Sequence, residues 1–181
     1  MSKENMQKNK IKVFPLISKS EIKKKVKDLS QKISQDYKGK ELNLILVLKG
    51  AFVFGADLIR FLKIPARVYF LRAKSYEKDK STGKVKIEFS AGKEIEGKNV
   101  LILEDILDTS LTLKEIIKFL KKFQPKEIKT CVLLEKKVPK REKIKVDYVG
   151  FKIENKFIVG YGIDYDERFR NLPYIGYIKL N

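Results

Sequence analysis

Three largely apolar runs of strand length restrict the fold of this chain more than any other feature of its sequence. They are LNLILVL (42–48), NVLILE (99–104) and EIKTCVLLE (127–135). A strand that is covered on both faces has such a continuous pattern, whereas a strand with one face in water alternates. Segments 49–63 and 111–123 follow the first two runs and carry apolar residues at helical spacing. Strands alternating with helices predict an α/β fold with a central, mainly parallel sheet flanked by helices.

A further helix is predicted near the start of the chain, over residues 18–37. Ser18 precedes Glu21 by three residues, which is the spacing of a capping box. Gly39 follows, as glycine commonly does at the end of a helix. The apolar residues at helical spacing are Ile22, Val26, Leu29 and Ile33. The remaining predicted strands are 66–76, 84–90, 146–153, 157–165 and 174–180.

The composition predicts one compact domain over residues 1–181. With 43% hydrophobic residues the chain can bury a core, and its apolar runs are too short to span a bilayer. The N-terminal lysines precede no apolar stretch, so we expect no signal peptide and predict a cytoplasmic location. The single cysteine, Cys131, lies in an apolar run and is interpreted as a packing residue. Because the chain has no histidine, a Cys/His zinc site is excluded.

The net charge of +18 raises the question of a nucleic-acid partner. The excess is concentrated in residues 1–40 and 114–145, each with 12 Lys and Arg against 4 Asp and Glu. Lysines outnumber arginines by 35 to 6, whereas bidentate readout of phosphates or bases favours arginine. We therefore interpret the charge as a lysine-rich solvated surface and expect no specific nucleic-acid partner. A weak attraction to polyanions is expected in either case.

Carboxylates and hydroxyls crowd into residues 104–112, directly after the second apolar run. They are Glu104, Asp105, Asp108, Thr109, Ser110 and Thr112. Ligands of parallel α/β sheets bind beyond the carboxyl ends of the strands, where a strand–loop–helix unit favours a phosphate. Paired carboxylates beside a phosphate indicate Mg²⁺ or sugar hydroxyls between them, so the segment predicts a sugar-phosphate site that uses Mg²⁺. Asp108 is then a candidate acid or base, unless the acids only cap the helix and offset its dipole.

The same stretch, VLILEDILDTSLTL (100–113), resembles the phosphoribosyl pyrophosphate signature of the type I phosphoribosyltransferases. Four other segments resemble the hypoxanthine-guanine branch of that family, in the same order along the chain. They are LVLKGAFVFGADLIR (46–60), LRAKSY (71–76), LLEKKVP (133–139) and VDYVGFKIENKFIVGYGIDYDERFRNLPYIG (146–176). The resemblance covers roughly residues 40–178 and is weak before them.

The resemblance implies a type I phosphoribosyltransferase fold. Residues 1–40 and 150–181 would contribute to a small hood, and Ser75 and Tyr76 would begin a mobile lid loop. The family transfers phosphoribosyl from phosphoribosyl pyrophosphate to N9 of hypoxanthine or guanine, giving IMP or GMP and pyrophosphate, with Mg²⁺ as cofactor. It also implies a homodimer or homotetramer, in which the apolar segment 52–62 is either an interface or ordinary core.

For phosphoribosyl pyrophosphate the resemblance implies a binding set drawn from three segments. It consists of Lys49, Gly50, Glu104, Asp105, Asp108, Thr109, Ser110, Leu111, Thr112 and Arg170. The family characteristically has a cis peptide before the lysine, here Leu48–Lys49, and an arginine, here Arg170, that meets pyrophosphate. Glu104 and Asp105 would hold the ribose hydroxyls and a magnesium shell, and Asp164 would bind a second Mg²⁺.

For the purine the resemblance implies five residues with separate roles. Asp108 would be the general base facing N7, and Lys136 would donate a hydrogen bond to O6. Phe157 would stack on the ring, which is worth roughly 1–3 kcal/mol for a base on an aromatic side chain. The backbone of Ile158 would read the purine edge, and the carbonyl of Asp164 would accept from a guanine amino group.

Two questions stay open at this point. Ser110 stands where the family usually has glycine. Serine there costs about 1 kcal/mol or more if the position needs positive φ, and little if it needs a right-handed helical conformation. The charge also leaves a rival function, a phosphoribosyltransferase-fold regulator that senses nucleotides and binds nucleic acid, and a third, an α/β binding domain. Asp108, Lys136 and segment 155–164 favour the enzyme, without deciding among hypoxanthine, guanine and xanthine.

Overall fold

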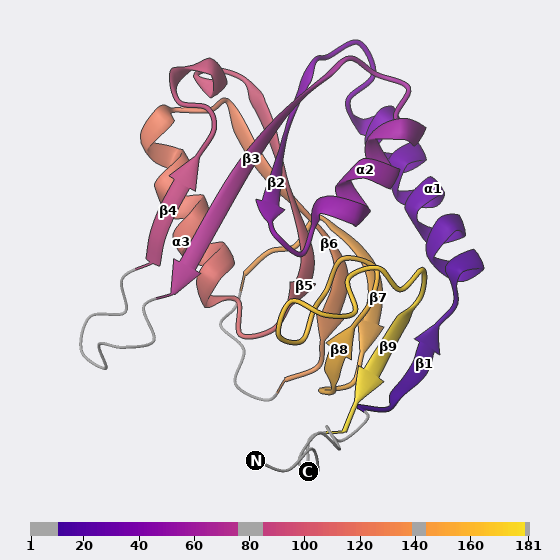
Figure 1. The fold of residues 1–181 in the computed structure, drawn as a ribbon. Coiled ribbons are helices and arrows are strands. Elements are labelled where there is room, and N and C mark those ends of the chain that lie inside the picture. The colour runs from indigo at the N-terminus through magenta and orange to yellow at the C-terminus, as the bar shows by residue number, and fades with distance from the viewer. Residues whose placement is uncertain (1–10, 76–84, 139–143, 180–181) are drawn as a thin grey trace.

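A central six-stranded sheet organises the chain. The computed structural model describes residues 11–75, 85–138 and 144–179. The strand order is β4-β3-β2-β5-β6-β7, and neighbouring strands are parallel except β3 and β4. The strands are β2 (Leu42–Leu48), β3 (Ala66–Ser75), β4 (Val85–Phe89), β5 (Asn99–Leu107), β6 (Glu127–Lys136) and β7 (Tyr148–Ile153). The predicted α/β fold with a mainly parallel sheet is confirmed (Figure 1).

Helices cover both faces of this sheet. α1 (Lys19–Asp36) and α2 (Phe52–Phe61) pack on one face, and α3 (Leu111–Leu120) packs on the other (Figure 1). Alternate residues of β2 therefore enter two separate cores, Leu44 with the first pair of helices and Ile45 with α3. This double coverage is the reason for the largely apolar runs of β2, β5 and β6. Two 3₁₀ turns precede β5 and follow α3: η1 (Lys93–Ile95) and η2 (Lys121–Phe123).

The start of α1 has the predicted capping box. The Oγ atom of Ser18 accepts from the backbone N–H of Glu21 at 3.3 Å, and the Glu21 carboxylate accepts from the N–H of Ser18 at 2.8 Å. The helix ends at Asp36, and Gly39 follows with a φ of 74°. The four residues of the predicted apolar stripe are all buried: Ile22, Val26, Leu29 and Ile33.

A second, three-stranded antiparallel sheet forms a hood over one end of the molecule. Its order is β1-β9-β8, with β1 at Val13–Ile17, β9 at Ile175–Ile178 and β8 at Phe157–Val159. The hood lies at the end of the large sheet toward which the arrowheads of β2 and β3 point (Figure 1). β1 is not predicted from the sequence, because it is short, contains Pro15 and pairs with a strand near residue 178.

Two predicted strands have different lengths in the structure. β5 continues to Leu107, three residues beyond its predicted end, because it stays paired with β6. Asp105, which the predicted bounds leave in the loop, therefore lies within the strand together with Glu104. The strand predicted over 157–165 stops at Val159, because residues 160–162 all have positive φ and leave the extended conformation.

Two predictions from composition concern the core and the membrane. Cys131 is fully buried in β6, and burial raises the pKa of its thiol, so its interpretation as a packing residue is confirmed. Among the described residues, the helices are too short or too polar to cross a membrane.

Candidate active site

Segments from three adjacent strands end at the carboxyl edge of the sheet. The peptide bond Leu48–Lys49 at the end of β2 is cis, as the resemblance implies. Residues 104–112 contain the end of β5 and the turn into α3, and Lys136 is the last residue of β6. Ser75 ends β3, whereas Tyr76 and the rest of the predicted lid to residue 84 lie outside the described residues.

Gly50 follows the cis peptide and lies against the carboxylate of Asp105. A Cβ atom at position 50 would overlap that carboxylate, and a Cβ atom at Gly162 would overlap the carbonyl oxygen of Gly50. The end of β2, the end of β5 and the hood therefore leave no room for a methyl group at either glycine. Both glycines are required for this close approach, which an ordinary Lys-Gly pair in the sequence does not reveal.

Glu104 and Asp105 form an acidic pair that is largely withdrawn from water. Burial raises the pKa of both carboxyls, and the charge of Asp105 raises the pKa of Glu104 further. The Oε2 atom of Glu104 is covered and has no hydrogen-bond partner among the described residues. Because a buried carboxylate oxygen without a partner is costly, this arrangement favours a cation or hydroxyl donors as a ligand.

The loop before α3 surrounds a small cavity of about 130 Å³. Its polar lining consists of Glu104, Asp108, Thr109, Ser110 and Thr112. Ser110 is buried and has a φ of 72°, so of the two conformations left open by the sequence it adopts the left-handed one. This conformation costs serine about 1–2 kcal/mol. Because α3 begins at Leu111, its first N–H groups and the positive end of its dipole are available to an anion that binds at this loop.

Asp108 and Lys136 form an ion pair between the loop after β5 and the end of β6. The Nζ atom of Lys136 lies 2.8 Å from Oδ2 of Asp108. The lysine side chain is only 12% exposed, whereas that of Asp108 is 48% exposed. The carboxylate is therefore accessible to a ligand, and the cation beneath it is already oriented.

Arg170 and Glu167 lie in the segment between β8 and β9, and Glu167 connects this segment to the same edge of the sheet. The guanidinium of Arg170 donates to the carbonyl oxygen of Gly162 at 2.8 Å and lies 2.9 Å from the carboxylate of Asp164. It also lies 3.0 Å from Oε2 of Glu167, whose Oε1 is 2.5 Å from Nζ of Lys49. Glu167 is the one charged residue among these contacts that the sequence does not predict, because nothing distinguishes it there from other surface acids.

Three of the five purine residues implied by the resemblance, Phe157, Ile158 and Asp164, lie in β8 of the hood or in the segment after it. Phe157 is 39% exposed at the start of β8, and its ring packs edge-to-face on Tyr165 at a centroid distance of 5.3 Å. Ile158 is buried, so its backbone rather than its side chain is available to a ligand. Asp164 receives a hydrogen bond from the N–H of Glu167 at 2.9 Å.

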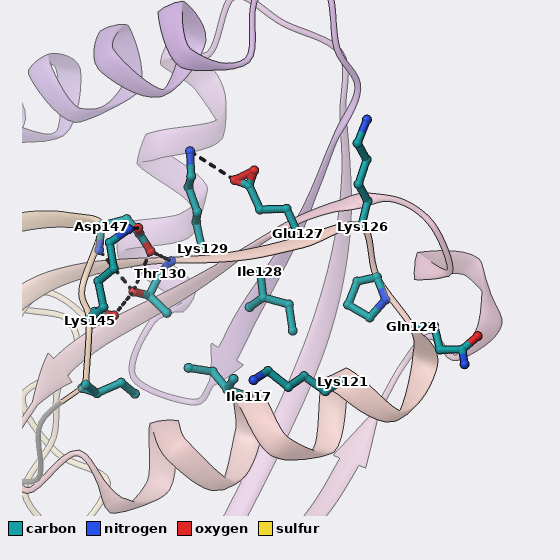
Figure 2. Close-up of a pocket in the computed structure, with 12 residues that line it drawn as sticks. Ile117, Lys121, Gln124, Lys126, Glu127, Ile128, Lys129, Thr130, Lys145 and Asp147 are labelled. Atoms are coloured by element: carbon teal, nitrogen blue, oxygen red, sulfur yellow. Dashed lines mark hydrogen bonds and ion pairs between the residues drawn. The ribbon is translucent and has the colours of Figure 1, made fainter.

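A larger cavity, of about 560 Å³, lies at the opposite, amino edge of the sheet (Figure 2). Several of its polar side chains are already paired with one another, Lys129 with Glu127 at 3.1 Å and Thr130 with Asp147 at 3.4 Å. Lys126 points away from the hollow (Figure 2). Because its lining contains none of the predicted site residues, this cavity is not part of the candidate active site.

Comparison with known proteins identifies the family. The chain matches the model of the phosphoribosyl transferase domain over residues 17–166. It is 44% identical over 160 residues to the hypoxanthine-guanine phosphoribosyltransferase of Aquifex aeolicus, covering 87% of this chain and 90% of that protein. The chain belongs to the hypoxanthine-guanine phosphoribosyltransferase family.

The similarity to two other members of the family extends over nearly their whole length. The hypoxanthine phosphoribosyltransferase of Salmonella typhimurium is 41% identical over 168 residues, which cover 91% of this chain and 94% of that protein. A crystal structure of a hypoxanthine-guanine phosphoribosyltransferase from Bacillus anthracis superposes with a TM-score of 0.85 at 43% identity, covering 94% of this chain and 98% of that chain. These relatives carry a transferase activity in their names, which does not favour the rival nucleic-acid-binding regulator.

Proposed function

We propose that this phosphoribosyltransferase transfers phosphoribosyl from phosphoribosyl pyrophosphate to N9 of hypoxanthine or guanine, as its relatives' names suggest. The observation that carries this proposal is the ion pair of Asp108 and Lys136, 2.8 Å apart at the carboxyl edge of the sheet. A 6-oxopurine has O6 and N7 next to each other on one edge. An ammonium beside a carboxylate matches an O6 acceptor beside an N7–H donor.

The same pair gives a reason for rejecting adenine. Adenine presents an amino group at position 6, so two donors would face each other if its amino group met Lys136. A site that is built for an acceptor rejects a ligand that cannot accept, because its buried cation then loses a partner. The exposed carboxylate of Asp108 is placed to take the purine proton from N7 as the bond from C1′ to pyrophosphate breaks and the bond from C1′ to N9 forms.

The remaining site residues fit the sugar phosphate and a magnesium ion. The N–H groups of residues 109–112 and the start of α3 would hold the 5′-phosphate. Mg²⁺ takes oxygen ligands and commonly one or two carboxylates beside substrate phosphates, and the unpartnered Oε2 of Glu104 fits this preference. Glu104 and Asp105 would hold one ion and Asp164 a second. Bound magnesium supplies positive charge that offsets the charge of the pyrophosphate group.

The outer face of α2 supports a proposal about assembly. Phe54 and Leu58 are core residues, but Phe52 is 43% exposed. Beside it lies a largely apolar cavity of about 810 Å³ between α1, α2 and residues 161–173. We propose that this face joins subunits of a homodimer or homotetramer, because apolar surface of this kind is typical of interfaces. Sedimentation velocity would test it, and a monomer at micromolar concentration would contradict it.

Pyrophosphate release tests the proposed function directly. The protein is mixed with phosphoribosyl pyrophosphate and Mg²⁺ and is offered hypoxanthine, guanine, xanthine or adenine separately. We expect turnover with at least one oxopurine and much less with adenine. If none of the four purines releases pyrophosphate above the rate without purine, the proposed activity is wrong.

A further inference from the structure

The carboxylate of Glu167 bridges the two cations that are proposed to hold pyrophosphate. Its Oε1 lies 2.5 Å from Nζ of Lys49, and its Oε2 lies 3.0 Å from Nη2 of Arg170. Each oxygen of the carboxylate therefore contacts one cation, as two oxygens of a phosphate group would. The two ion pairs, to Lys49 and then to Arg170, also hold the pKa of Glu167 below its usual range, so the group carries its charge at neutral pH.

The turn that presents Glu167 has an unusual backbone. Asp166, Glu167 and Phe169 have φ values of 53°, 59° and 73°, in the left-handed region that residues other than glycine seldom adopt. Tyr165 and Arg168 exchange two backbone hydrogen bonds of 3.1 Å, which close the turn. Non-glycine residues in this region are costly, and such conformations cluster at functional sites and switch regions. The turn holds Glu167 toward Lys49 rather than leaving it free in solvent.

We propose that Glu167 is an internal stand-in for pyrophosphate, which occupies Lys49 and Arg170 in the free enzyme and which phosphoribosyl pyrophosphate must displace. This inference rests on the proposed function, since it assigns Lys49 and Arg170 to the pyrophosphate group. The Glu167 side chain is 62% exposed, so it has room to swing into solvent when the ligand arrives. A pyrophosphate group carries more charge than one carboxylate and therefore wins the competition when its concentration is sufficient.

The competition sets the apparent affinity of the free enzyme. If the site is available only while Glu167 has moved away, the measured dissociation constant is the intrinsic one divided by the fraction of molecules in that state. Exposed ion pairs are individually weak, so two of them lower the affinity by a modest factor, about two- to tenfold. The contact would also favour product release, because the returning carboxylate replaces the departing pyrophosphate on the same two cations.

Calorimetric titration of the full chain with pyrophosphate, with Mg²⁺ in both solutions, tests the inference. Glu167→Gln keeps the shape of the side chain but removes the charge, and we expect it to bind pyrophosphate about two- to tenfold more tightly than the wild type. The matched control is Glu41→Gln, which changes the net charge equally and breaks an ion pair with Arg67 of 3.1 Å at the amino end of β2. Affinity that is unchanged or weaker in Glu167→Gln would overturn the inference, because Glu167 would then only order the two cations.

Steady-state kinetics separates this inference from the proposed function. In Glu167→Gln we expect the KM for phosphoribosyl pyrophosphate to fall by a similar factor, while the KM for hypoxanthine stays unchanged. A general structural role would move both constants or lower kcat alone. If the wild type shows no turnover, the proposed function fails, and the pyrophosphate titration still decides whether Glu167 competes for this anion site.

Discussion

The ammonium of Lys136 and the carboxylate of Asp108 meet at 2.8 Å although 28 residues separate them in the chain. They meet because β5 and β6 are adjacent parallel strands whose carboxyl ends finish at the same edge of the sheet. α3 occupies much of the connection between them and packs on one face, as crossover connections between parallel strands do. The chemistry of this pair is therefore a consequence of the topology.

Replacing the carboxylate at position 108 should remove the proposed base without changing its shape. For Asp108→Asn we expect kcat to fall by at least about 10²-fold, because general bases contribute this much or more. Pyrophosphate release at saturating substrates measures it. Asp28→Asn, an exposed position on α1, is the control and should keep full activity. A loss of less than tenfold in Asp108→Asn would contradict the assignment of the base.

Removing the cation at position 136 should weaken oxopurine binding and reduce the preference for hypoxanthine over adenine. For Lys136→Met we expect kcat/KM for hypoxanthine to fall by about 10- to 10²-fold, because a hydrogen bond to a charged group is worth about 1.5–3 kcal/mol. Lys137→Met, at the exposed neighbour that pairs with Glu154, is the matched control. The ratio of kcat/KM for hypoxanthine to kcat/KM for adenine is measured in both variants. If this ratio is the same in Lys136→Met as in the wild type, Lys136 does not recognise the oxopurine.

Adding a single methyl group at Gly50 should disturb the acidic pair. In Gly50→Ala the new Cβ would overlap the Asp105 carboxylate, so either the loop or Asp105 must move. We expect the KM for phosphoribosyl pyrophosphate to rise by at least about tenfold, because misplacement of binding groups by about 1 Å is costly. Gly92→Ala is the matched control, because a Cβ there meets Glu94 only at an ordinary contact of 3.6 Å.

The left-handed conformation at position 110 should reverse the usual stability order of alanine and glycine. Both Ser110→Ala and Ser110→Gly remove the hydroxyl, so their difference reports on the backbone alone. We expect Ser110→Gly to have the higher free energy of unfolding by about 1 kcal/mol, because φ is 72°. At Ser34, inside α1, the same two substitutions should show the opposite order, with alanine favoured by about 1 kcal/mol. Urea unfolding of the four variants gives both differences.

The buried acids should make the free protein less stable as the pH rises. Burial raises the pKa of Glu104 well above its ordinary value of 4.5. Between the ordinary pKa and the raised pKa of Glu104, the folded state keeps a proton that the unfolded state has released. The free energy of unfolding therefore falls as the pH increases. Glu104→Gln cannot titrate and should therefore lose less stability than the wild type between about pH 5 and pH 8. Urea unfolding at several pH values measures both proteins. If their free energies of unfolding fall equally with pH, the pKa of Glu104 is not raised.

The central sheet could be predicted from the sequence because its cause is local. Burial on both faces leaves a largely apolar run in β2, β5 and β6, and the capping box of Ser18 with Glu21 lies within four residues. The hood could not be predicted in the same way. β1 depends on β9, which is more than 150 residues away, and its own sequence includes Pro15. Pairing over such a separation leaves no periodic signal in either segment alone.

The candidate site shows the same limit at the level of single residues. The acids and hydroxyls of 104–112 are visible because they are adjacent in the chain. Glu167 is found only in the structure, because its contact with Lys49 joins residues 118 positions apart. The end of β5 predicted from the sequence is three residues too early, because Asp105 interrupts the apolar pattern and yet remains in the strand.

The pairing of β1 with β9 affects the order in which the parts of the enzyme fold during synthesis. β9 is the middle strand of the hood, so neither β1 nor β8 has a partner in that sheet before residue 178 has left the ribosome. The strands of the large sheet and the loop before α3 contain no residue beyond 153. A growing chain could therefore assemble the loop before α3 early, whereas the part of the purine site that lies in the hood would form among the last events of synthesis. Fragments that stop short of β9 are expected to bind phosphates without catalysing transfer.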